Sequence, residues 1–298
     1  MPDFPITGGH TLDIEFAPDI FLVGIRSPDG KCQNWERSEE WEDDIDVLRQ
    51  MVTGKLLITF NGLNFDFPLL CHVLTEELTD PAEIYEYGSK LITARDDKQA
   101  RQTAYRYRLK YSHIEGVDHI DLFALSGGKG LKTLALRMEL PSLQSFDFTP
   151  NAVIGVRDYE RLRRYNISDL DVTAALYECH NESLQTRQLA SIKYSTDLRS
   201  KGDSQLGEFV ILHEYEARTG STSADVRASR LGGVTVPKFV PSWLGSIKHP
   251  AILEWYSSIP THIPIEKSEL GKAVTRSLFI GDRYFKTGSG GLHSIDDP

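Results

Sequence analysis

The sequence has few cysteines, no long apolar run and no excess of positive charge. Its three cysteines, Cys32, Cys71 and Cys179, are far apart, which excludes a disulfide framework and a zinc site of the Cys-x-x-Cys kind. No stretch approaches the about eighteen apolar residues of a membrane-spanning helix. The N-terminal residues lack the basic and apolar regions of a secretion signal. We therefore expect a cytoplasmic protein with no membrane partner.

Charge is distributed unevenly along the chain. The 298 residues include 33 basic and 43 acidic ones, which gives a net charge of −10. This excludes a protein that holds duplex nucleic acid by attraction over its whole surface, so any nucleic-acid contact must be local. Residues 196–298 contain 12 basic and 12 acidic residues, whereas residues 1–195 contain 21 and 31. The acidic excess therefore belongs to the first two thirds of the chain.

The first part of the chain alternates predicted strands and helices. Three short strands come first, HTLDIEF, IFLVGIR and KCQNW, and Ser38 is placed to cap a following helix. A buried strand LLITF precedes the helix LLCHVLTEEL, and VDHIDLFAL predicts a further strand. A short helix, GLKTLALRM, and a long helix from near Asp158 complete the series. This order predicts an α/β layer with a mixed sheet, three antiparallel strands being followed by parallel ones.

The segment between the second helix and the last strand is harder to interpret. Residues 80–100 are polar and irregular, and AYRYRLKY alternates apolar with basic residues, which predicts a strand with one basic face. That face, formed by Arg106, Arg108 and Lys110, could guide a single nucleic-acid strand. It could also be a solvated edge that discourages sheet aggregation, and we favour this second interpretation.

The composition changes beyond about Tyr194 to glycine, serine and proline with scattered strands. Gly281-Asp282, inside SLFIGDRYFKTG, predicts a tight hairpin. We therefore predict one domain over residues 1–195 and a smaller α+β segment over residues 196–298. The second segment contains no motif that we would interpret as catalytic.

Two Asp-x-Glu pairs occur in the chain, and their expected local structures differ. Asp13 and Glu15 fall on a strand, where residues two apart share a face and can reach one ion together. Asp158 and Glu160 fall on a helix, where residues two apart diverge by about 200°. We therefore interpret the first pair as a candidate ligand pair and the second as solvated residues at a helix end.

Two further acids are expected near the same place. Asp66 ends the sequence NGLNFD after a buried strand, at the carboxyl end where open α/β sheets bind ligands, with Leu63 and Phe65 packing inward. Tyr165 and Asp169 lie four apart on the long helix and share a face. Asp171 is turned away from that face, and we expect it to be solvated.

The types of these residues point to a particular chemistry. Asp13, Glu15, Asp66 and Asp169 offer carboxylate oxygens without cysteine or histidine partners, which suits Mg²⁺ or Mn²⁺ rather than structural zinc. Clustered without cations, they would repel one another. A pair of divalent ions about 4 Å apart removes this repulsion and serves in-line displacement at phosphorus. The residues themselves thus suggest phosphodiester hydrolysis.

These motifs resemble those of the DEDD 3′-to-5′ exonucleases of ribonuclease H-like fold, specifically the tyrosine subclass found in DNA polymerases. Asp13 and Glu15 match the first motif, residues 61–66 the second and residues 165–169 the third. The resemblance spans most of residues 10–180, including HIDLFAL and GLKTLALRM between the second and third motifs. It implies a metal-dependent enzyme that shortens single-stranded DNA from its 3′ end and releases 5′-nucleotides.

The resemblance also implies a role for each matched residue. Asp13, Glu15 and Asp169 would hold the ion that activates the attacking water, and Asp13 and Asp66 would support a second ion. Tyr165 would aim the water at the terminal phosphate. Among the second-motif residues, Asn61 would contact the substrate strand, and Phe65 would either do the same or belong to the core.

The last part of the chain carries a narrower resemblance. LRSKGDSQLGEFVIL and TGSGGLHSIDDP are similar to the stretch that leads into the polymerase domain of bacteriophage family B-like DNA polymerases. No Tyr-x-Asp-Thr-Asp polymerase motif follows. The resemblance implies a proofreading exonuclease module, either a fragment or half of a split enzyme, that incorporates no nucleotides. Its partners would be single-stranded DNA 3′ ends and a polymerase domain or subunit, in the host cytoplasm if the protein is viral.

Other functions and simpler residue roles stay open. The chain could be a noncatalytic module that binds DNA or docks a polymerase, or it could degrade RNA. Asp13 and Glu15 could be exposed strand residues, Asp66 a helix cap and Tyr165 a core residue. Four further candidate ligands are expected to have ordinary structural or polar roles: Asp118, His119, Asp121 and His10. The roles of Lys129 and Lys132, near a predicted helix start, stay undecided.

Overall fold

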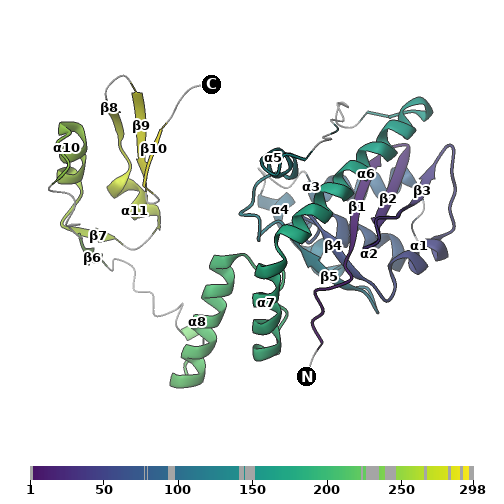
Figure 1. Ribbon diagram of the computed structural model, residues 1–298, viewed down its shortest axis with the longest axis horizontal. Coiled ribbons are helices and arrows are strands. Elements are labelled where there is room, and N and C mark those ends of the chain that lie inside the picture. The colour runs from purple at the N-terminus through teal and green to yellow at the C-terminus, as the bar shows by residue number, and fades with distance from the viewer. Residues whose placement is uncertain are drawn as a thin grey trace. The chain divides into compact units, whose positions relative to one another are not determined.

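The computed structural model divides the chain into two compact units, residues 1–209 and 210–298 (Figure 1). We describe each unit by itself. The functional boundary near residue 195 stays a prediction. The structure describes residues 3–76, 78, 80–92, 98–140, 144, 152–222, 224–225, 235–238, 246–264, 267–280, 283–288 and 291–294.

The first unit is built on a five-stranded mixed sheet in the order β3-β2-β1-β4-β5. The first three strands pair antiparallel, whereas β4 pairs parallel with both β1 and β5. This topology confirms the predicted ribonuclease H-like α/β fold. The strands are β1 (His10–Ala17), β2 (Ile20–Arg26), β3 (Cys32–Ser38), β4 (Leu56–Thr59) and β5 (Asp118–Asp121).

Helices cover both faces of this sheet. Leu12 and Ile14 of β1 face a core formed with α1, α2 and α3, whereas Ala17, Ile20 and Leu22 face α6. The helices of the unit are α1 (Ile45–Val52), α2 (Asp66–Glu76), α3 (Pro81–Ile92), α4 (Lys98–Lys110), α5 (Leu131–Arg137), α6 (Val156–Cys179) and α7 (Asn181–Tyr194). An eighth, α8 (Asp203–Thr219), begins in this unit and continues into the second.

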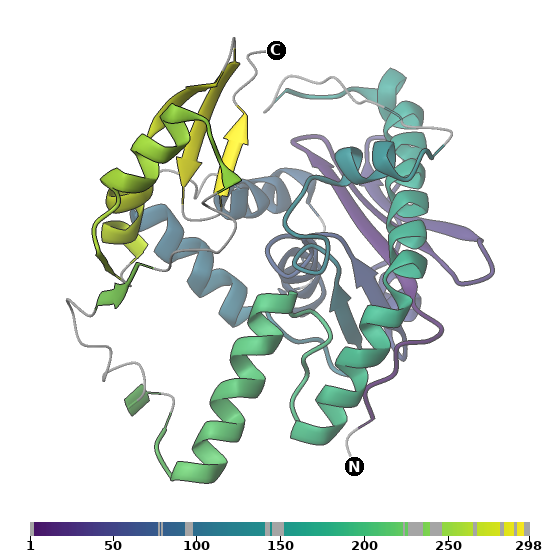
Figure 2. The same cartoon turned by 60° about the vertical axis from the view of Figure 1, so that its left-hand side comes forward.

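The long helix α6 is fixed to the sheet near its N-terminus and again in its first half. The carboxylate of Asp19, in the turn between β1 and β2, accepts the N–H groups of Ile154 and Gly155 at 2.9 and 2.7 Å. Arg163 of α6 donates from Nε to Glu36 Oε2 of β3 at 2.7 Å. Figures 1 and 2 show the helix lying along the strands. These contacts fix which side chains of α6 face β1.

Two helix starts differ from the sequence prediction by different amounts. α6 begins at Val156, two residues before the predicted Asp158, and such small differences are usual at frayed helix ends. α1 begins at Ile45, and its cap is Asp44, whose side chain accepts an N–H of the first turn. The prediction of Ser38 as the cap was wrong, because Ser38 ends β3 instead.

The predicted strand AYRYRLKY is wrong, since these residues lie in or directly after α4, and residues 80–100 include the helix α3. The alternating pattern is real but short. Ala104, Tyr107 and Tyr111 follow the spacing of three and four residues that puts side chains on one helix face, and Ala104 and Tyr111 are buried. Arginine, lysine, glutamine and alanine also favour a helix intrinsically. These residues therefore form part of a 13-residue helix, although their alternating pattern also fits a strand.

Within its described residues, the second unit contains two small sheets and, after the end of α8, short helices. β6 (Thr235–Pro237) pairs antiparallel with β7 (His262–Pro264), and β9 (Arg283–Gly288) lies between β8 (Ser277–Ile280) and β10 (Gly291–Ser294). The helices are α10 (Pro250–Ser258) and α11 (Lys267–Val274). The predicted hairpin turn at Gly281-Asp282 lies outside the described residues. Of the described helices in either unit, none combines the length and apolar character that crossing a membrane requires.

Candidate metal centre

Strand β1 presents two carboxylates on the face that α6 covers. Because side chains alternate along a strand, Leu12 and Ile14 enter the core and Asp13 and Glu15 point to the opposite face. Asp13 pairs in register with Gly24 of β2, which leaves room for α6 above it. The predicted shared face of Asp13 and Glu15 is confirmed, since their carboxylates come within ligand spacing of each other.

Helix α6 brings a third carboxylate to this pair. Asp169 is only 8% exposed and faces β1. One carboxylate oxygen each from Asp13, Glu15 and Asp169 lies within 4.8 Å of the other two. Across the described ranges, no other three histidine, cysteine or acidic side chains meet this spacing. We call these three residues the carboxylate trio.

Asp66 lies beside the trio without belonging to it. Asp66 is the first residue of α2 and is 5% exposed. Its Oδ1 accepts a hydrogen bond from the N–H of Ile14 at 3.2 Å. Ile14 separates Asp13 from Glu15 along β1. The charge of Asp66 also raises the pKa of Asp13, after the larger effects of burial and of Glu15. The fourth predicted acid is therefore near the trio but outside its ligand spacing.

Burial disfavours the charged forms of all four acids, and repulsion from the other acids of the site adds to this effect for Asp13 and Glu15. Burial followed by the charge of Asp169 raises the pKa of Glu15 to about 8. Burial raises the pKa of Asp66 to about 7, although backbone N–H donors oppose the change. Burial raises the pKa of Asp169 and, with the charge of Glu15, raises the pKa of Asp13 well above its ordinary value. Such a cluster gains most from a bound cation.

Tyr165 points its hydroxyl at the trio. It donates a hydrogen bond to Asp169, which opposes the rise in the pKa of that carboxyl. Burial and then the charge of Asp169 raise the pKa of Tyr165 above its ordinary value, so the phenol keeps its proton. The predicted shared helix face of these two residues is thus confirmed. Whether Tyr165 orients a water molecule stays a prediction.

Two residues of the site were missed or left undecided at the sequence level. Lys132 of α5 places its Nζ 4.7 Å from the ring centroid of Tyr165, and its charge lowers the pKa of Glu15 and Asp169. Asn166 is fully buried and donates from Nδ2 to Asp13 Oδ2 at 2.8 Å. Its spacing of three residues from Asp169 indicated a shared helix face, but nothing in the sequence indicated that it would hold Asp13.

The loop before Asp66, residues 61–65, is fixed by hydrogen bonds to the carboxylate of Asp121. Asp121 Oδ1 accepts the N–H of Asn61 at 2.8 Å, and Oδ2 accepts that of Leu63 at 3.0 Å. Asn61 has a φ of 66°, a left-handed conformation that asparagine tolerates better than most residues. We call residues 61–65 the second-motif loop. Asp121 acts structurally, as predicted.

The structure shows the protein contacts of the predicted substrate-binding residues Asn61 and Phe65, and their contact with substrate stays a prediction. The Asn61 side chain accepts a hydrogen bond from Asn64 Nδ2 at 2.8 Å. Phe65 is half-buried against the core, with its ring centroid 5.2 Å from that of Phe16. Leu63 is 48% exposed, so its predicted inward packing is wrong. The turn held by Asp121 rotates Leu63 away from the core.

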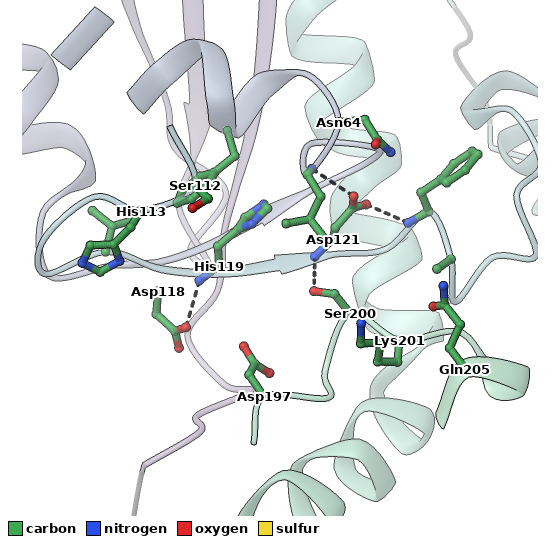
Figure 3. A pocket seen from close by; sticks show the side chains of 15 residues that line it. Asn64, Ser112, His113, Asp118, His119, Asp121, Asp197, Ser200, Lys201 and Gln205 are labelled. Carbon is green, nitrogen blue, oxygen red and sulfur yellow. Dashed lines mark hydrogen bonds between the residues drawn. The ribbon is translucent and has the colours of Figure 1, made fainter. Parts of the chain in front are cut away.

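A cavity of about 630 Å³ opens at the edge strand β5 (Figure 3). The acids that line it have partners. Asp118 and Asp197 both pair with the buried Arg199, at 2.6 and 2.7 Å, and Asp121 accepts backbone N–H groups. His119 stacks on Phe67 with ring centroids 4.3 Å apart. The structural roles predicted for Asp118, His119 and Asp121 are confirmed, and the cavity lacks the uncompensated charge of the trio.

The remaining acids and histidine are also placed as expected. Asp171, 60% exposed at its side chain, pairs with Arg26 at 2.8 Å and is turned away from Asp169 of the trio. Glu160 pairs with Arg164 at 3.6 Å near the start of the same helix. His10 contacts the carbonyl of Gly8. These residues are therefore useful comparisons for the trio.

The donor set of the site fits divalent cations. Three carboxylates at ligand spacing, a fourth beside them and raised pKa values provide hard oxygen ligands whose repulsion a cation would relieve. Lys132 supplies one positive charge against four acids. Among the residues that the structure describes, no cysteine or histidine joins this cluster, although these are the ligands that zinc prefers.

No protein-family model matches the sequence, and no curated protein matches it. Among solved structures, a family B DNA polymerase from the hyperthermophilic archaeon Pyrobaculum calidifontis is similar, with a sequence identity of 15% and a TM-score of 0.47. The match covers 81% of this chain and 32% of that chain, so the chain spans about a third of the polymerase's length. A likeness this distant carries no argument about activity, which depends on the site itself.

Proposed function

We propose that the protein is a metal-dependent 3′-to-5′ exonuclease that hydrolyses single-stranded DNA ends to 5′-nucleotides. One observation carries the proposal. Asp13, Glu15 and Asp169, which are far apart in sequence, place carboxylate oxygens within 4.8 Å of one another. Asp66 and Tyr165 lie next to this trio, as the resemblance to DEDD exonucleases requires.

The residues present are suited to hold two ions, Mg²⁺ or Mn²⁺. The carboxylate trio would hold one, and Asp13 together with Asp66 would support the other. Bound there, such ions supply a nucleophilic water at neutral pH and stabilise charge on the leaving 3′-oxygen. Cationic ligands are the natural complement to acids whose pKa values burial has raised.

The chain's own residues would orient the reactants. Tyr165 keeps its phenolic proton and can direct the attacking water at the terminal phosphate. Asn166 fixes the rotamer of Asp13 through its hydrogen bond of 2.8 Å. Asn61 and Phe65 would contact the last nucleotides of the strand. Lys132 lies near Tyr165 and would balance part of the negative charge of the phosphate.

We further propose that the biological use is proofreading, in association with a DNA polymerase domain or subunit. Support comes from the sequence resemblance of residues 196–298 to the lead-in of a family B-like polymerase domain. The absence of a polymerase metal motif from the sequence indicates that this chain does not extend a primer. Extension of a primed template by the chain alone would contradict this part of the proposal.

The activity can be tested with a 5′-labelled single strand incubated with Mg²⁺ or Mn²⁺. We expect a ladder that shortens from the 3′ end and disappears with chelator. Asp13→Ala and Asp169→Ala should each lower the rate by about 10³-fold, because metal-assisted charge stabilisation contributes several kcal/mol. Tyr165→Phe should lose less, about 10- to 100-fold, since it alters only orientation.

Asp171→Ala is the matched control for these variants. Asp171 is an acid on the same helix but pairs with Arg26 on the outer surface, so its removal should leave the rate unchanged. Undiminished cleavage by Asp13→Ala would refute the assignment of the site. DNA binding without shortening would favour a noncatalytic module, and preferential shortening of an RNA strand of the same sequence would favour an exoribonuclease.

A further inference from the structure

Helix α4 is strongly basic in a strongly acidic chain. Its 13 residues include five basic side chains and no acidic one, whereas the whole chain has a net charge of −10. A cluster of this kind raises the local potential even when the global charge is negative. The positions of the five cations on the helix therefore decide what the cluster can do.

The inner face of α4 is anchored beside the second-motif loop. Arg108 donates from Nε to the carbonyl of Asn64 in that loop at 2.9 Å. Lys110 pairs with Glu76 of α2 at 3.2 Å. Two of the five cations thus serve the fold. Through Arg108, the helix is fixed next to the loop that leads into Asp66.

The outer face of α4 presents a different set of side chains. Arg101 and Arg106 are exposed, and neither forms an ion pair with a residue that the structure describes. Tyr105 and Leu109 are 61% and 58% exposed, although aromatic and aliphatic side chains of this size are usually covered. Tyr105 lies one helical turn from Arg101 and one from Leu109, so the three form a continuous stripe with Arg106 at its side.

We propose that this outer face binds single-stranded DNA that leads into the carboxylate trio. Guanidinium groups that pair with phosphates, next to an exposed ring on which a base can stack, are the combination that single-strand binding uses. The side chains of the trio offer no positive charge to a phosphate backbone, so a cationic surface outside the site can hold the strand. The nature of the strand rests on the proposed function, whereas the surface itself rests on the charges and exposure of α4.

The proposal can be tested by fluorescence anisotropy of a labelled single-stranded oligothymidylate with the full chain in chelator, over a series of salt concentrations. Removing both cations with Arg101→Ala and Arg106→Ala should reduce the slope of log K against log salt by about 1.4, because each phosphate contact to a single strand contributes about 0.7. Tyr105→Ala should weaken binding about fivefold or more, and Tyr105→Phe should restore it.

The control removes two positive charges elsewhere in the same unit, with Lys31→Ala and Lys193→Ala. Lys31 lies at the β2–β3 turn and Lys193 near the end of α7, and both are exposed. The control should keep the wild-type slope. An unchanged slope in the Arg101 and Arg106 variant, or an equal reduction in the control, would overturn the proposal.

Failure of the activity and failure of this surface give different results. Binding is measured in chelator, where no hydrolysis takes place. A chain that binds through α4 yet leaves the labelled strand intact with Mg²⁺ would contradict the exonuclease and support the surface. A chain that shortens the strand while its α4 variants bind like wild type would contradict the surface alone.

Discussion

At the scale of single residues, the site brings carboxylates close together and fixes one of them, Asp13, by a hydrogen bond. Asp13, Glu15 and Asp169 crowd their carboxylates on a largely desolvated face, and burial is the largest cause of their raised pKa values. In the metal-free protein, protons relieve the repulsion. Cations relieve it when they are bound. Protons and metal ions should therefore compete for the same oxygens.

Glu15 provides a pH test of this competition. Burial raises its pKa from an ordinary value of 4.5 to about 8, so between these values the folded state binds more protons than the unfolded state. The free energy of unfolding in chelator should therefore fall as the pH rises through this window. In Glu15→Gln, the contribution of Glu15 to this fall in the free energy of unfolding should be absent. Thermal unfolding from about pH 5 to pH 8 measures it, and an equal decline in both proteins would contradict the account.

Asn166 provides a test of restraint. It is fully buried and donates a hydrogen bond of 2.8 Å to Asp13 Oδ2. Without this bond, in Asn166→Ala, the Asp13 side chain can rotate out of its ligand position. We expect Mn²⁺ to bind about 10- to 100-fold more weakly, as for other residues that orient metal ligands. Electron paramagnetic resonance of free Mn²⁺ measures this without any reaction. Wild-type affinity in a folded variant would contradict the role.

At the scale of elements, the close approach of α6 to β2 assembles the site. Asn166 of α6 lies directly over Gly24 of β2, where a Cβ atom would come within 1.8 Å of Asn166 Oδ1. No rotation of a flexible side-chain end relieves this contact, because Asn166 is fully buried. The glycine therefore sets the distance between helix and sheet, and with it the spacing of the trio.

Substituting this glycine should move the helix and destabilise the fold. We expect Gly24→Ala to lower the free energy of unfolding by about 1–3 kcal/mol, the usual cost of overpacking. Gly207→Ala is the control, since an added Cβ at Gly207 in α8 would meet nothing within 4 Å, and alanine there should stabilise the helix by up to about 1 kcal/mol. Urea unfolding of both variants measures the difference. A stability for Gly24→Ala at or above wild type would show that α6 adapts freely.

The elements differ in how well the sequence predicts them. The strands β1, β2 and β4 were predictable because apolar runs and alternation report burial directly. α4 was predicted wrongly, because eight alternating residues fit a strand, and the helix is favoured by intrinsic propensity together with the tertiary packing of Ala104 and Tyr111. For the trio, strand geometry predicted the shared face of Asp13 and Glu15, whereas the approach of Asp169 to them was expected from the resemblance to the DEDD exonucleases. Asn166 and Lys132 were not predictable, because their roles depend on contacts across elements.

At the scale of the whole molecule, the charge and the candidate site lie in one unit. Residues 1–195 hold the entire acidic excess, and the trio, Asp66 and Tyr165 all lie in the unit of residues 1–209. Residues 210–298 form a separate compact unit with its own sheets. Metal binding should therefore act on the stability of one unit directly.

This separation predicts a selective effect of metal on unfolding. Calorimetry of the full chain should show two transitions, because two compact units need not unfold together. Mg²⁺ should raise the midpoint of one transition, with a gain of about 2.7 kcal/mol at a concentration one hundred times its dissociation constant. Asp13→Ala should abolish this shift and leave the other transition unchanged. Equal shifts of both transitions would contradict the assignment of the metal site to one unit.

Anomalous scattering from crystals soaked in Mn²⁺ tests the central claim most directly. The account predicts a peak coordinated by the carboxylates of Asp13, Glu15 and Asp169, with further density toward Asp66. It also predicts that the peak is lost in Asp169→Ala and kept in Asp171→Ala. A saturating soak with no peak among these side chains, or with manganese bound only elsewhere, would contradict the account.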